Sequence, residues 1–189
     1  MKLEIKLLVL TTAIFTLFSC GIGTSEQSAD AKGFEAIEKE IKSKFGDDPY
    51  LTDLTITYNN SIGNIIGVTI TDAPESLKMG QWNFTQGNWM QNSEISLEVP
   101  EGSKAADFMF QLNDEVNLSK LGELVEKSRK QLKDEKKIEN PILSTAHIFF
   151  PKNGDISKAE YYVNLKPENG GTNFRFIYKL NGELIKMDY

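Results

Sequence analysis

An amphipathic helical segment followed by four short alternating segments occurs twice in this sequence, in the same order. Within each helical segment the apolar residues recur every three or four positions, which is the spacing of one helix face. In the first segment they are Phe34, Ile37, Ile41 and Phe45, and in the second Leu118, Leu121, Val125 and Leu132. Because an amphipathic helix must bury its apolar face, each helix is expected to pack on the strands that follow it.

The eight strand candidates alternate apolar and polar residues, which is the period of a half-buried strand. They are residues 51–58, 64–71, 80–85 and 93–99 in the first half, and 142–150, 157–165, 172–180 and 183–189 in the second. The dipeptides Asn153-Gly154 and Asn181-Gly182 favour hairpins between neighbouring candidates. We therefore predict an α+β fold of two antiparallel four-stranded meanders, each covered by one helix, which repeat one plan with little residue identity.

These segments divide the chain into two units and a linker. Residues 33–100 are predicted to form the first α+β unit and residues 118–189 the second. Residues 101–117 are read as a linker, in which the stretch ADFMFQL has the alternation of an additional strand.

The faces of the two meanders that point away from the helices should be solvated. In the first unit the outward set is rich in hydroxyl and amide groups: Thr55, Thr57, Thr69, Thr71, Asn83, Thr85 and Ser96. In the second unit it is charged and aromatic: Lys158, Glu160, Tyr162, Asn164, Arg175, Lys179 and His147. A ligand or a partner protein can dock on such a face, although threonine is also favoured on any solvated strand.

Four residues are candidates for an interaction surface. His147, Tyr162 and Arg175 belong to the outward set of the second unit. Trp89 follows the Gln86-Gly87 turn, where an indole ring can be exposed as an anchor.

The sequence contains few groups typical of catalysis. His147 is the only histidine and therefore the natural candidate for a general base. No Gly-x-Ser-x-Gly elbow, phosphate-binding loop or spaced cluster of His and carboxylate ligands accompanies it. A hydrolase that uses His147 with neighbouring carboxylates is the catalytic alternative, but the sequence favours a non-enzymatic protein without a cofactor or metal.

The chain is acidic, with 21 Lys and Arg against 27 Asp and Glu and a formal net charge of −6. A nucleic-acid-binding protein needs clustered basic residues to contact phosphates, so nucleic acid is not an expected partner. The same balance argues against electrostatic docking of the whole chain to anionic lipid headgroups.

The first twenty residues read MKLEIKLLVLTTAIFTLFSC, with lysines at positions 2 and 6 and an uncharged run from Leu7 to Phe18. This run is too short to cross a hydrocarbon core of about 30 Å as a helix. Its length and basic flank are typical of a secretory signal, and a buried N-terminal helix is the alternative.

The end of this run resembles the lipobox of bacterial lipoproteins. Leu17, Ser19 and Cys20 match the pattern, and Phe18 departs from its usual small residue. The resemblance implies that residues 1–19 are removed, that Cys20 receives a diacylglyceryl thioether, and that its new amino group is acylated, typically with palmitate. Cys20 is the only cysteine, so without lipidation it would be a free thiol or would form an intermolecular disulfide.

Residues 20–32 are then the lipidated cysteine and a flexible tether. Gly21 is not the aspartate associated with inner-membrane retention, which favours anchoring to the outer membrane and exposure to the periplasm.

The plan of a helix on four strands resembles the units of PepSY-type domains and of beta-lactamase-inhibitor-like proteins. This is a resemblance of fold plan, because no residue motif of either family is present. The expected function is a membrane-anchored lipoprotein of the cell envelope that binds a protein or a small ligand without catalysis. An envelope inhibitor or chaperone-like protein is an alternative with the same anchor.

Overall fold

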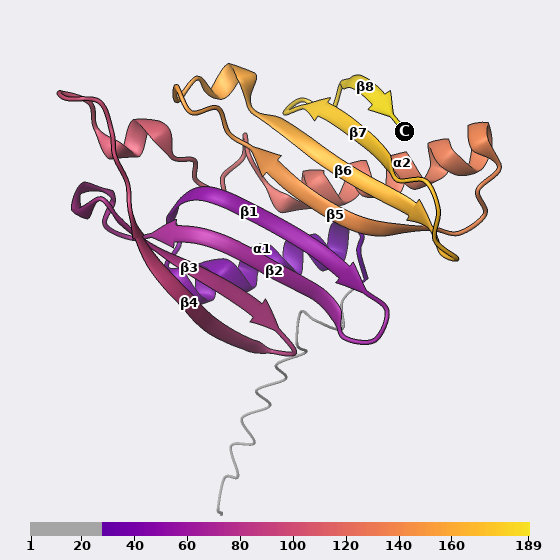
Figure 1. Ribbon diagram of the computed structural model, residues 1–189, viewed down its shortest axis with the longest axis horizontal. Helices are drawn as coiled ribbons and strands as arrows, with labels where there is room; N and C mark the ends of the chain where they lie inside the picture. Colours follow the sequence, from indigo (N-terminus) through magenta and orange to yellow (C-terminus); the bar gives the residue numbers. More distant parts are fainter. Residues whose placement is uncertain (1–27) are drawn as a thin grey trace, which may run out of the picture.

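The eight strands found within residues 28–189 pair in one antiparallel sheet, in the order β4-β3-β2-β1-β5-β6-β7-β8 (Figure 1). The computed structural model describes residues 28–189, so the predictions for the signal peptide and Cys20 lie outside the described residues. The first half contains α1 (Ala31–Phe45), β1 (Tyr50–Asn59), β2 (Gly63–Thr71), β3 (Lys78–Thr85) and β4 (Asn88–Ser96). The second half contains α2 (Leu118–Lys136), β5 (Pro141–Phe149), β6 (Glu160–Pro167), β7 (Phe174–Lys179) and β8 (Leu184–Asp188).

The predicted α+β class and the order of helices and strands are confirmed, but the expectation of two separate meanders is wrong. The first strands of the two halves pair with each other, at Thr55 with His147, Ile56 with Ala146 and Thr57 with Thr145. If the halves were separate, β1 and β5 would each be an edge strand with a row of unpaired backbone groups. Pairing them satisfies these groups and joins the halves into one sheet.

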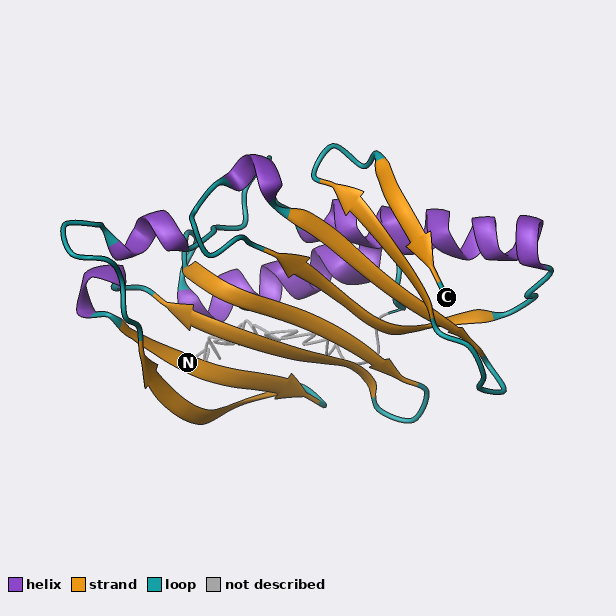
Figure 2. Cartoon of the chain, turned by 45° about the horizontal axis from the view of Figure 1, so that its top comes forward, coloured by secondary structure: helices purple, strands orange, loops and turns teal. Residues whose placement is uncertain are grey.

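Both helices lie on the same side of this sheet and pack against each other (Figure 2). Their apolar faces and the inward residues of the strands form one continuous core that includes Phe34, Ile56, Leu121 and Phe176. Among residues 28–189, no helix combines the length and apolar character needed to cross a membrane.

The side chains that precede the helices act as N-caps. Asp30 accepts a hydrogen bond from Gly33 N at 2.9 Å, and Asn117 accepts one from Lys120 N at 2.8 Å. α1 therefore starts at Ala31, two residues before the expected unit boundary, and Ala29 is already buried.

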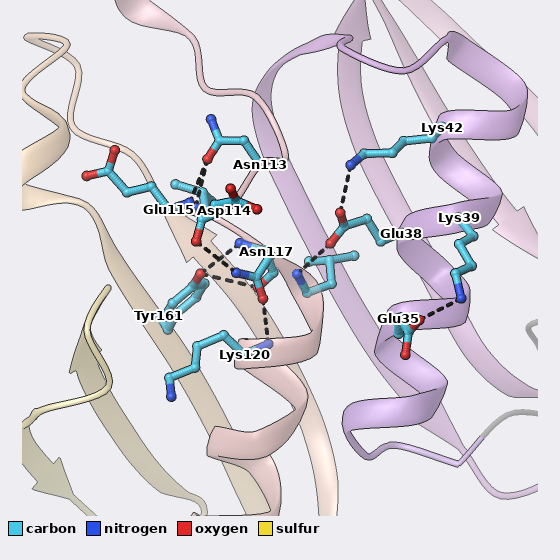
Figure 3. Close-up of polar contacts among 12 residues, drawn as sticks. Glu35, Glu38, Lys39, Lys42, Asn113, Asp114, Glu115, Asn117, Lys120 and Tyr161 are labelled. Carbon is cyan, nitrogen blue, oxygen red and sulfur yellow. Dashed lines mark hydrogen bonds and ion pairs between the residues drawn. The ribbon is translucent and has the colours of Figure 1, made fainter.

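Each helix also holds the N-terminus of the other. Glu38 of α1 accepts a hydrogen bond from Leu118 N at the start of α2, at 2.9 Å, while its second carboxylate oxygen binds Lys42 at 2.8 Å (Figure 3). In return, Arg129 of α2 donates to Ala29 O, just before α1, at 2.7 Å. A hydrogen bond therefore joins the two helices near the start of each one.

The two halves share an irregularity that relates them geometrically. The pairing of β1 with β2 has one extra residue between Leu51 and Asp53, and that of β5 with β6 has one between Leu143 and Thr145. His147 follows Thr55 by the same number of residues as Leu143 follows Leu51, so Thr55 and His147 are equivalent positions of the two halves. These two residues are also direct partners in the sheet. An approximate two-fold axis perpendicular to the sheet therefore passes between them.

Two local predictions differ from the structure. The stretch ADFMFQL is not a strand: residues Ala105–Phe108 form a 3-10 helix, and only Phe110 makes a β-bridge, to Leu51. The alternation there reflects Phe110 and Leu112, which extend from this connection into the main core. The fourth strand begins at Asn88 instead of 93, because the two-residue turn leads directly into it.

Candidate functional site on the open face of the sheet

Within residues 28–189, α1 and α2 both lie on one side of the sheet, and we call the opposite side the open face (Figure 2). Directly paired residues on antiparallel strands point to the same side. One such row crosses all eight strands through Met90, Asn83, Gly67, Thr55, His147, Tyr162, Ile177 and Lys186. His147 is therefore at the middle of the open face, beside the approximate two-fold axis.

Three of the four candidate interaction residues come together here. The ring of His147 stacks on Tyr162, with centroids 4.7 Å apart and planes at 18°. Phe149 also contacts Tyr162, with ring centroids 6.0 Å apart. Arg175 donates to Asn164 at 3.3 Å in the neighbouring row. We refer to His147, Phe149 and Tyr162 as the aromatic cluster.

The residues of the aromatic cluster are uncharged near neutral pH. Burial lowers the pKa of His147 below its ordinary value, and the positive charge of Arg175 lowers it further. Burial also raises the pKa of Tyr162, whose hydroxyl donates to Glu160 at 3.0 Å. Arg175 therefore supplies the positive charge beside a neutral aromatic surface.

A shallow groove of about 650 Å³ continues from the aromatic cluster. Phe149 and Ile185 contribute apolar surface to it, and each is 44% exposed. Lysines 152, 158 and 179 line the same groove. Two of them are ion-paired, Lys158 with Asp155 and Lys179 with Glu183, so the rim is not a concentrated positive charge.

Phe149 is the residue that the sequence analysis missed. It lies in the same alternation phase as His147, so the strand pattern already places it outward. This signal is weak by itself, because a phenylalanine at a strand end is more often part of a core than of a surface.

Trp89, the fourth candidate, is not on the open face. Its register partner is Phe84, and its ring packs on Phe45 and Phe84 with centroids 5.0 Å apart in each case. Its indole N–H donates to Glu40 of α1 at 2.9 Å. The expectation that Trp89 is an exposed anchor is therefore corrected: it fastens β4 to the first helix.

The first half of the open face carries the expected hydroxyl and amide groups. Thr55, Gly67 and Asn83 are direct partners in the central row, and Thr57 pairs with Thr145 of the second half. Asp53 is the charged exception, and removal of water by the surrounding sheet raises the pKa of its carboxyl.

In the second half, Lys158 is not part of a strand as predicted, because Ile156–Lys158 form a 3-10 turn.

The surroundings of His147 favour its neutral form. Its aromatic partner is Tyr162, and its charged neighbour is the cation Arg175, which disfavours the imidazolium form. A general base of a hydrolase would need a nucleophile or an orienting carboxylate within hydrogen-bond distance. Within residues 28–189, no group of three or more His, Cys, Asp and Glu side chains is placed to hold a metal ion.

Comparison with known proteins adds no relative. No protein-family model matches the chain, and no curated protein and no solved structure matches it significantly. Functional inference therefore rests on the residues and on their arrangement in the fold.

Proposed function

We propose that the protein is a membrane-anchored lipoprotein of the cell envelope, and that its folded domain is a non-enzymatic binding module that uses the open face. The observation that carries the proposal is the aromatic cluster with Arg175 at the middle of the sheet face opposite the two helices. Aromatic and arginine side chains near the centre of a surface are the residues that most often dominate protein–protein binding energy.

The size of the open face favours a protein over a small ligand as the partner. Eight strands about 4.8 Å apart, with about six residues of roughly 3.3 Å each, make a surface of about 700 Å². This is close to the roughly 800 Å² that each partner contributes to an ordinary protein–protein interface. An envelope inhibitor would be one form of such a module.

The anchor is proposed from the sequence alone, on the lipobox-like end of the apolar run and on Cys20 as the only cysteine. It predicts that the mature protein is acylated at Cys20 and fractionates with membranes. A Cys20→Ala variant should remain unprocessed and unacylated, as measured by mass spectrometry of the purified chain. A Cys20→Ala protein that is still cleaved and acylated would contradict the anchor.

The binding surface is tested by affinity capture from envelope extract with the full chain and two double variants. Tyr162→Ala with Arg175→Ala removes groups from the open face. Lys39→Ala with Lys130→Ala is the control, because both lysines are largely exposed on the helices, at 74% and 77%.

The expected result is a partner that binds the native chain and the control but is lost from the open-face variant, with equal thermal stability of all three. Equal capture by the open-face variant would place binding elsewhere.

We also infer that the two halves are a tandem repeat. The recurring irregularity in β1 and β5 and the direct pairing of Thr55 with its equivalent His147 support this. Equivalent positions nevertheless carry different side chains, so the aromatic cluster belongs to the second half alone.

A further inference from the structure

The antiparallel pairings divide the connections of the molecule between two ends of the sheet. We call one the tether end; it contains residues 28–30, the turns 60–62, 86–87 and 168–173, the connection 137–140 and the C-terminus. The other, the loop end, contains the connections 46–49, 72–77, 97–117, 150–159 and 180–183. In Figure 1 the β1–β2 and β6–β7 turns and the C-terminus lie together on the right.

The acidic excess of the chain is concentrated at the loop end. Its five connections contain eleven Asp and Glu against three Lys. The rest of residues 28–189 contains fourteen Asp and Glu against sixteen Lys and Arg. The protein is therefore polarised, with an acidic loop end and a body that is close to neutral.

The described chain begins at the opposite, tether end. Ala29 O accepts a hydrogen bond from Arg129 in the C-terminal half of α2, and α1 then runs toward the loop end. Cys20 is eight residues before Ser28, a length of chain that spans at most about 29 Å. β1, with ten residues of roughly 3.3 Å each, extends for about 33 Å between the two ends.

These lengths decide which end can reach a bilayer. If the loop end rested on the lipid, Ser28 would be about 30 Å above the surface, and even a fully extended chain to Cys20 would barely reach. With the tether end down, the same eight residues reach the bilayer easily. An anionic lipid surface also repels the acidic loop end over roughly a Debye length of about 8 Å.

We propose that the tether end faces an anionic bilayer and that the acidic loop end points away from it. The strands then run roughly along the membrane normal, and the open face remains accessible to a partner. The inference rests on the proposed acylation of Cys20 and adds an orientation to it. It also explains how an acidic protein is held at an anionic surface: the tether-end segments carry three acidic residues against one lysine, so the surface meets the less acidic of the two ends.

The test uses the full acylated chain in vesicles of three parts phosphatidylcholine to one part phosphatidylglycerol, with an acceptor dye on a small fraction of headgroups. Because acylation blocks Cys20, an introduced cysteine is the only free thiol for a donor dye. Ser61→Cys labels the tether end and Ser103→Cys labels the loop end, both at exposed serines. Mass spectrometry of each preparation reports the acyl groups on Cys20.

The expected result is energy transfer from position 61 at least about twofold greater than from position 103, given their separation by the length of the sheet. Acylated protein with equal or reversed transfer overturns the orientation alone. Protein without acyl groups overturns the proposed anchor and the orientation with it.

The contribution of charge is tested with Glu98→Gln and Glu101→Gln together, in the chain labelled at position 103. Neutralising these loop-end residues should raise transfer from position 103 in anionic vesicles and leave it unchanged in pure phosphatidylcholine. Unchanged transfer in both kinds of vesicle would overturn the electrostatic part of the proposal.

Discussion

Gly122 and His147 are two single positions whose surroundings decide the effect of a substitution. Gly122 lies inside α2, where glycine ordinarily costs about 1 kcal/mol relative to alanine. In the fold it is the point at which α2 passes the N-terminus of α1. A Cβ atom there would be 2.6 Å from both Ala31 Cα and Asp30 O, which are backbone atoms with little freedom to move.

Gly122→Ala should therefore destabilise the protein by about 1–3 kcal/mol, the cost of overpacking, although helix propensity alone predicts a gain. Ser119→Ala in the same helix is the control and should be close to neutral. The free energy of unfolding from urea denaturation measures both. A stabilising Gly122→Ala would show that the helices can separate at this crossing without cost.

The protonation of His147 should make stability depend on pH. Its pKa is lowered in the folded state, so as pH falls through about 6.5 the unfolded chain takes up the proton first. The stabilisation is complete above that value and is lost as pH falls toward the folded pKa. Tyr162 and Arg175 face His147, and the pKa of Tyr162 is raised further above this range.

His147→Thr, which copies the equivalent residue Thr55, should remove this part of the dependence. The measurement is the difference in melting temperature between pH 7.5 and pH 5.5, which should be smaller in the variant. Equal differences in the two proteins would mean that other groups control the acid side.

At the scale of the elements, the packing of α1 on α2 is stabilised by side chains of each helix that hydrogen-bond to the backbone at the start of the other. Glu38 is the central one: it is 16% exposed, holds Lys42, and satisfies the Leu118 N–H at the start of α2 (Figure 3). Such an N–H has no partner within its own helix and lies at the positive end of the helix dipole. A carboxylate is therefore the matching group.

Glu38→Ala should cost about 1–3 kcal/mol of unfolding free energy, because it leaves this donor unsatisfied in a partly buried place. Glu38→Gln keeps an acceptor and should cost less. Glu35→Ala is the matched control, since Glu35 also pairs with the lysine four residues later but is 52% exposed, and it should cost less than about 0.5 kcal/mol. Equal losses for Glu35→Ala and Glu38→Ala would mean that the contact with α2 contributes nothing.

At the scale of the whole molecule, one core and one sheet join the two halves. The buried cluster runs from Phe34 of α1 to Phe176 of β7, and β1 pairs with β5 in the middle of the sheet. Two halves that share their main core are expected to unfold in one cooperative step.

Phe34→Ala and Phe176→Ala, one in each half, should each cost about 3–5 kcal/mol and still leave a single transition. Helix content from circular dichroism and tryptophan fluorescence should then change together. The fluorescence reports the first half, because both tryptophans lie in β3 and β4. A variant in which the two signals separate would show that the halves fold independently.

Local patterns account for much of this fold. The apolar spacing in residues 34–45 and 118–132 predicts both helices, and alternation predicts most of the strands and which residues share a face. His147, Tyr162 and Arg175 could be placed outward for the same reason. These features depend on neighbours in the chain, which a sequence displays directly.

Long-range pairing was decided by the fold. Alternation assigns Thr55 and His147 to a face but does not say which strand lies beside theirs. The pairing of β1 with β5, and with it the central position of His147, therefore could not be predicted. Trp89 was misplaced because its partners, Phe45 and Glu40, belong to a helix some forty residues earlier in the chain. The polarity between the tether end and the loop end likewise arises only when the strand directions sort the acidic loops to one side, since charge in a linear sequence has no direction in space.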